Sequence, residues 1–142
     1  MDGRPPAGYR SLPHTADVRI EAWAPSCEEC VAQAVAALLA SFVDVAGAEP
    51  EGTVRYHIEP GADEDVLAAV LDEVIYLLDT DGRVPVAAQV AAADDGGLDV
   101  ELRMAAPDQV VLTGAVPKAV SLHELRFERG PGGWWCRVTF DV

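Results

Sequence analysis

The chain has 142 residues, half of them hydrophobic, and carries a formal net charge of −14 from 24 acidic and 10 basic side chains. This charge argues against strong direct binding to nucleic acid, because such binding uses Lys and Arg to displace counterions from the phosphates. No apolar run approaches the ~20 residues that cross a membrane, and the first residues lack the basic-then-apolar order of a secretory signal.

The same composition predicts one globular domain in a reducing compartment. Three cysteines are too few for a disulfide scaffold, and their odd number fits reducing conditions. We therefore expect a cytoplasmic protein without membrane association. Residues 1–8, rich in Pro and Gly, are predicted to be a flexible tail, and residues 9–142 to form a single domain.

The first half of the domain alternates strand and helix patterns. Strict alternation of apolar and polar side chains indicates a strand, and apolar residues spaced by three and four indicate a helix. The patterns predict a strand over 17–23, a helix over 27–43, a strand over 53–59 and a helix from about 63 to 79–82. Ser26 and Glu29 have the spacing of a capping box, which marks the start of the first helix.

The second half reads as strands joined by hairpins. Strands are predicted over 84–93, 98–105, 110–116, 119–128 and 134–142, and the Gly-rich segments 94–97 and 129–133 provide hairpin turns. The apolar phase of the 119–128 strand slips at His123 and Glu124, which predicts a β-bulge. The order of elements predicts an α+β fold with two helices packed on one face of a mainly antiparallel β-sheet.

Carboxylates at both ends of the domain form the first candidate site. Asp141 and the terminal carboxylate of Val142 follow directly on the last strand pattern, and Asp17 opens the first. If these two strands are neighbours, the three groups converge. Hard oxygen donors suit Ca²⁺ or Mg²⁺ better than zinc. The alternative is that both aspartates are solvated strand ends.

The cysteines offer a competing site. Cys27 and Cys30 form a C-x-x-C motif at a helix start after a strand, the setting of thiol-disulfide enzymes. The glutamates between them oppose a thiolate, and Cys27 is in phase with the apolar face of the helix, so packing is the simpler interpretation. The histidines have no metal-ligand spacing, and His57 shows no functional signal.

Four segments, in this order, resemble the archease family. They are 14–17 (HTAD), 71–79 (LDEVIYLLD), 118–125 (KAVSLHEL) and 138–142 (VTFDV). The resemblance covers about residues 9–142. It implies an archease-like α+β protein that is not itself an enzyme. Such a protein binds and activates an RtcB-type RNA ligase in tRNA splicing or RNA repair, by promoting guanylylation and multiple turnover.

The resemblance also implies the site residues. Asp17, Asp141 and Val142 match the family's ligands for a divalent cation, typically Ca²⁺, with Mg²⁺ or Mn²⁺ also acceptable. His14, Lys118 and His123 are expected to contact the partner or support the site.

The chain departs from the family pattern within residues 107–122, which affects the contacts expected there. Two other functions remain open. One is a chaperone-like module for RNA-processing proteins such as tRNA methyltransferases, and the other is a thiol-disulfide oxidoreductase that uses Cys27 and Cys30.

Overall fold

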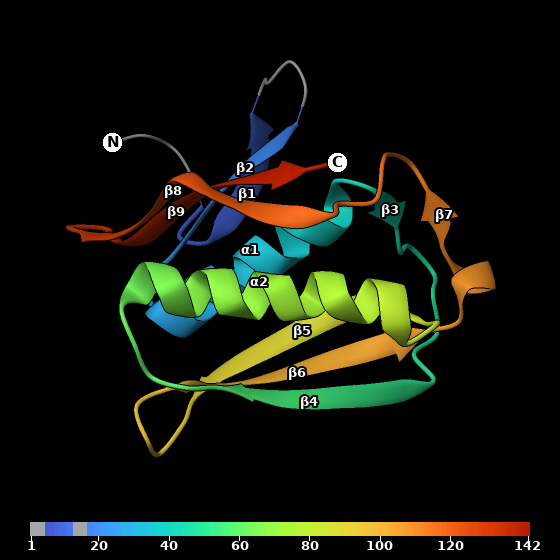
Figure 1. Ribbon diagram of the computed structural model, residues 1–142, viewed down its shortest axis with the longest axis horizontal. Helices are drawn as coiled ribbons and strands as arrows, with labels where there is room; N and C mark the ends of the chain where they lie inside the picture. The colour runs from blue at the N-terminus through green and yellow to red at the C-terminus, as the bar shows by residue number, and fades with distance from the viewer. Residues whose placement is uncertain (1–4, 13–16) are drawn as a thin grey trace.

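The computed structural model describes residues 5–12 and 17–142 and contains two main antiparallel sheets with both α-helices between them (Figure 1). The elements, in order, are β1 (Gly8–Leu12), β2 (Val18–Ala24), α1 (Cys27–Ala40), β3 (Val43–Asp44), β4 (Gly52–Ile58), α2 (Asp63–Thr80), β5 (Val84–Ala92), β6 (Leu98–Ala105), the 3₁₀ turn η1 (Pro107–Gln109), β7 (Val111–Leu112), β8 (Ala119–Gly130) and β9 (Gly133–Asp141).

Each sheet combines strands that are not consecutive in the chain. The first sheet has the order β1-β2-β9-β8, and the second has the order β4-β6-β5. Strands β3 and β7 form a separate pair. Helix α1 contacts β1 and β2 on one side and β5 on the other, and α2 contacts β8 as well as β4 and β5. The predicted α+β class with antiparallel strands is confirmed, and the structure adds that the helices separate two sheets.

A single hydrophobic core joins the layers. Its largest fully buried side chains come from α1, the turn after α1, α2 and both sheets, and they include Phe42, Phe140, Ile20, Leu38, Leu67, Leu71, Leu102 and Met104. This arrangement explains why both helix patterns contain wide apolar stripes, because each helix must bury two sides. Within the described residues, no helix is long and apolar enough to cross a membrane.

Most predicted element boundaries agree with the structure. Ser26 caps α1 by accepting a hydrogen bond from the Glu29 N–H at 3.1 Å, as the capping-box spacing predicts. The helix ends at Ala40 rather than at residue 43, because Val43 belongs to β3. The predicted 110–116 strand is reduced to the two residues of β7, and β1 was not predicted.

The predicted bulge in β8 is confirmed. The pairing of β8 with β9 shifts register between Ser121 and Arg126. Glu124 has a φ of +71°, a left-handed conformation that is uncommon outside glycine. The bulge changes the direction of the residues around it, so His123 and Glu124 both lie exposed on the surface near the end of β9.

Candidate metal-binding and partner-contact site

The first and last predicted strands are direct neighbours. Strand β2 pairs antiparallel with β9, and Val18 lies opposite Phe140. Extending this register by one residue places Asp17 opposite Asp141. Directly opposed residues of an antiparallel pair point to the same face of the sheet. Phe140 is fully buried and Asp141 is exposed, so the Asp141 side chain lies on the outer face, and the register brings the backbone of Asp17 beside it.

Strand β8 supplies the other side of this site. Ala119 lies opposite Asp141, and the Lys118 N–H donates a hydrogen bond to the Asp141 carbonyl at 2.8 Å. Because the Asp141 carbonyl already accepts this hydrogen bond, the side-chain carboxylate is the more available oxygen donor of Asp141. The end of β9 therefore lies between β2 and β8, and these two neighbouring strands hold Asp141 in place.

The β8 bulge adds an ion pair beside the carboxylates. Arg19 pairs with Glu124, and its Nε donates a hydrogen bond to the Thr139 hydroxyl at 3.3 Å. Two nitrogens of the Arg19 guanidinium are thus engaged by Glu124 and Thr139 beside the end of β9. His123 is exposed at the bulge, and its carbonyl accepts a 3.4 Å hydrogen bond from the Ser121 hydroxyl.

Helix α2 brings a further carboxylate to the same end of the molecule. The Val120 N–H of β8 donates a hydrogen bond to Asp72, while burial raises the pKa of the Asp72 carboxyl above its ordinary value. A hollow of about 600 Å³ lies between the helix and the segment before β8. Its lining includes Asp72, Asp79 and Lys118, so residues from the second and third family-like segments meet there.

The predicted ligand set fits a hard divalent cation in its chemistry. Two carboxylates and the Val142 oxygens are all oxygen donors, the type that Ca²⁺, Mg²⁺ and Mn²⁺ prefer. His14 lies outside the described residues, so its expected supporting role stays a prediction. Lys118 and His123 lie near the end of β9, Lys118 through its backbone contact and His123 through the bulge.

The environment of the cysteines argues against thiol chemistry. Burial, followed by the charge of Glu28, raises the pKa of Cys27 to about 11. The pKa of Cys30 is also raised, first by its hydrogen bond with Cys136 and then by burial. A nucleophilic thiol needs the opposite shift. Cys30 and Cys136 are fully buried, and Cys27, which was expected on the apolar face of the helix, is partly buried.

Sequence reasoning missed a second group of ligating side chains. His57, Glu59 and Asp95 present ligand atoms that all lie within 4.8 Å of one another. His57 and Glu59 are two residues apart, and Asp95 belongs to the β5–β6 turn. The available signal was a histidine near the end of a strand with an acid two residues later, but only the pairing of β4 with β6 brings the turn beside them.

The comparisons with known proteins agree with the arrangement of the fold. The model of the Archease protein family (MTH1598/TM1083) matches residues 9–142. The chain is 50% identical over 136 residues to "Probable protein archease" of Mycobacterium tuberculosis, covering 96% of this chain and 75% of that protein.

Two solved structures share the fold. The solution structure of Methanobacterium thermoautotrophicum protein 1598 matches with a TM-score of 0.78 at 22% identity, covering 95% of this chain and 99% of that one. The crystal structure of an archease from Thermotoga maritima, described as a possible chaperone, matches with a TM-score of 0.68 at 23% identity, covering 94% and 96%. The family match over almost the whole chain and the half-identical relative together show that this chain belongs to the archease family.

Proposed function

We propose that this protein is a metal-binding accessory factor that activates an RtcB-type RNA ligase. It would promote guanylylation and multiple turnover of the ligase in tRNA splicing or RNA repair, without catalysing the ligation itself. One observation carries the proposal. Three described family-like segments, on α2, β8 and β9, meet at one end of the molecule, and β2, which begins directly after Asp17, pairs with β9 there.

In this proposal Asp17, Asp141 and the Val142 oxygens hold one divalent cation, with Ca²⁺ the best match to an all-oxygen donor set. The cation supplies positive charge at the tip of an otherwise acidic protein, where it can meet nucleotide phosphates. The role of the sheet is to hold the donors. Asp141 is held at the end of β9, between β2 and β8, and the neighbouring Arg19 is paired with Glu124.

The charge of the chain supports a basic partner surface. The net charge of −14 favours approach to the positively charged channel that an RNA ligase needs for its substrate. Lys118 and His123 are the proposed partner-contact residues beside the cation, and His14 is proposed to support Asp17. The protein would thus bind the ligase and not RNA directly.

A second candidate function rests on exposed apolar side chains. Val111, Leu112, Val116 and Leu122, which precede or lie within β8, are between 43% and 70% exposed, and Tyr76 on α2 is 59% exposed. Apolar surface of this kind can bind other proteins. It favours a chaperone-like module for RNA-processing proteins, such as tRNA methyltransferases, as the alternative.

A multiple-turnover ligation assay with the cognate RtcB-type ligase tests the proposal. Asp141→Asn should reduce the stimulated turnover at least about tenfold, because loss of a ligand weakens the cation site by at least as much as loss of an outer-shell partner. Asp94→Asn is the matched control, since Asp94 lies on the exposed β5–β6 turn, away from the end of β9 (Figure 1). Full stimulation by Asp141→Asn would reject the metal-dependent role.

An aggregation assay separates the two candidates. Under the chaperone alternative, Asp141→Asn should still suppress aggregation of a client methyltransferase, whereas Leu122→Ser should not. Under the ligase proposal, Asp141→Asn should lose more stimulation of the ligase than Leu122→Ser in the ligation assay.

A further inference from the structure

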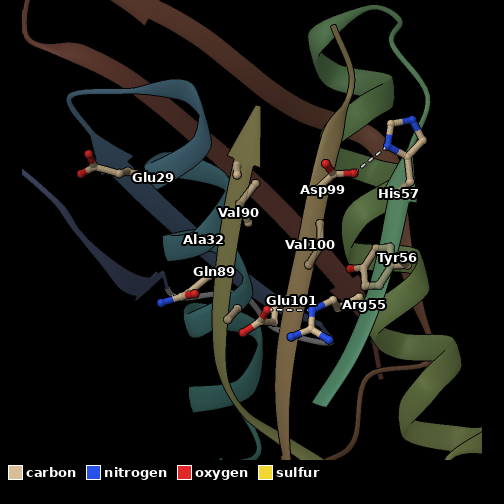
Figure 2. Close-up of a pocket in the computed structure, with 12 residues that line it drawn as sticks. Glu29, Ala32, Arg55, Tyr56, His57, Gln89, Val90, Asp99, Val100 and Glu101 are labelled. Carbon is tan, nitrogen blue, oxygen red and sulfur yellow. Dashed lines mark hydrogen bonds and ion pairs between the residues drawn. The ribbon is translucent and has the colours of Figure 1, made fainter. Parts of the chain in front are cut away.

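His57 lies between two carboxylates on the outer face of the second sheet. Figure 2 shows its ring projecting from β4 toward Asp99 on β6, with the Nδ1 atom 2.8 Å from the Asp99 Oδ1. The Nε2 atom is 2.8 Å from the Asp95 Oδ2. Glu59 follows on the same chain segment, and its carboxylate is within 4.8 Å of the His57 and Asp95 ligand atoms.

The backbone around these side chains is tightly constrained. His57 lies directly opposite Asp99 in the β4–β6 pairing. The Asp95 Oδ1 accepts a 2.8 Å hydrogen bond from the Gly97 N–H, and a Cβ at Gly97 would lie 2.1 Å from the Ile58 carbonyl oxygen. The turn therefore packs directly on the end of β4, and this contact holds the second Asp95 oxygen at the His57 ring.

The orientation of the imidazole is the feature that points to a ligand. Asp99 holds the Nδ1 side of the ring, while Nε2 lies on the Asp95 side, where Glu59 also offers a carboxylate. In metal sites a ligating histidine commonly has this arrangement, with an outer carboxylate fixing the tautomer and the second ring nitrogen presented to the ion. Asp99 lies outside the group of three donors, so it can keep the imidazole in place while Asp95 turns toward an ion.

We propose that His57 Nε2 and the carboxylates of Glu59 and Asp95 bind a divalent transition-metal ion, with Zn²⁺ the best match. Imidazole nitrogen favours Zn²⁺ and its transition-metal neighbours over Ca²⁺ and Mg²⁺. Zn–N and Zn–O distances of about 2.0–2.2 Å place donors roughly 3–4 Å apart, so small side-chain rotations suffice here. Water fills the remaining coordination position, because all three side chains are exposed.

The ion would join the end of β4 to the β5–β6 turn. On binding, the Nε2–H proton shared with Asp95 leaves to solvent, and Nδ1–H remains bonded to Asp99. Since the donors come together only in the folded chain, binding stabilises the fold in proportion to the logarithm of the free metal concentration. The excess of acidic groups in the chain favours cation binding in general. The site is separate from the all-oxygen site proposed at the end of β9.

Zn²⁺ titration of the full chain by calorimetry, together with thermal unfolding, tests this proposal. Wild type should bind Zn²⁺ and gain thermal stability. Glu59→Gln should weaken Zn²⁺ binding at least about tenfold, and Asp99→Asn about 10–100-fold through loss of ring orientation. Among the described residues Glu59 makes no hydrogen bond or ion pair, so its replacement leaves the metal-free fold unchanged.

Two control variants separate this site from other binding modes. Glu49→Gln replaces another exposed glutamate, and His123→Ala replaces an exposed histidine of the other sheet; both should keep wild-type Zn²⁺ affinity. Bound Co²⁺ should give visible absorption bands that Glu59→Gln reduces. Equal Zn²⁺ affinity in wild type, His57→Ala and Glu59→Gln, or no Zn²⁺ binding at all, would overturn the proposal. Asp141→Asn should retain this Zn²⁺ site, so the result is independent of ligase activation.

Discussion

Gly133 closes the β8–β9 hairpin with a φ of +122°, in a region that L-residues rarely adopt. A Cβ at this position would lie 2.4 Å from the Ala24 carbonyl oxygen, so the end of β2 leaves no room for a side chain. Gly130, at the other end of the same turn, has nothing within 4 Å of its hypothetical Cβ. The two glycines look equivalent in the sequence, and only their contacts distinguish them.

Gly133→Ala is therefore expected to lower the free energy of unfolding by about 1–3 kcal/mol, through backbone strain and the clash with β2. The matched variant Gly130→Ala should change it by less than about 0.5 kcal/mol, as an ordinary surface substitution does. Equilibrium urea denaturation followed by tryptophan fluorescence measures both. Equal effects of the two variants would show that the approach of β2 does not constrain this turn.

The junction between α2 and β5 depends on an ion pair. The Arg83 Nε and Nη2 donate hydrogen bonds to the Asp81 carboxylate at 2.6 and 3.0 Å. Asp81 is also the C-cap of α2, where its N–H donates to the Leu77 carbonyl at 2.9 Å. The hydrogen bond from Arg83 lowers the pKa of Asp81, so the carboxylate form favours the folded chain. This link fixes the direction in which the chain leaves the helix.

Because the pKa of Asp81 is lower in the folded chain, its stabilising effect is fully present above the unfolded value of about 3.9. The effect is lost as the pH falls through the lowered folded value. Asp81→Asn should thus be slightly less stable than wild type at pH 7, and the difference should disappear in strong acid. Urea midpoints measured between pH 7 and pH 2 test this, with Asp94→Asn as the control. A difference that stays constant with pH would exclude the ion pair as its cause.

At the scale of the whole molecule, the two helices separate two sheets that have different exposed features. The first sheet has Asp17 and Asp141 at one end, and the second has the His57, Glu59 and Asp95 group on its outer side. The shared core lets one small domain present both regions in fixed positions. The net charge of −14 acts over the entire surface and influences how any partner approaches.

Association with the RtcB-type ligase should accordingly slow as salt is added. Screening shortens the Debye length from about 30 Å at 0.01 M to about 3 Å at 1 M ionic strength. Stopped-flow measurement between 50 and 500 mM salt should show the association rate constant falling at least about tenfold, with a smaller change in the dissociation rate. A salt-independent association rate would remove electrostatic steering from the proposal but would leave cation-dependent activation to be tested separately.

Much of the candidate site could be predicted because its parts have local signals. The phase slip at His123 and Glu124 predicted the bulge, and the strand patterns placed Asp17 and Asp141 at strand ends. The sequence could not show that these two strands are neighbours. The structure shows it through the pairing of β2 with β9, whose residues are more than 100 positions apart in the chain.

The sequence by itself determined the helices, the hairpins, the Ser26 cap and the family, because these depend on residue spacing within a few turns or on ordered motifs. Tertiary structure decided which strands pair, how they divide into two sheets, and which distant side chains meet. His57 shows the difference, since its hydrogen-bond partners Asp95 and Asp99 are 38 and 42 residues away in the chain. Strand pairing is decided by burial in the core shared by both sheets, and local patterns carry no information about that partner choice.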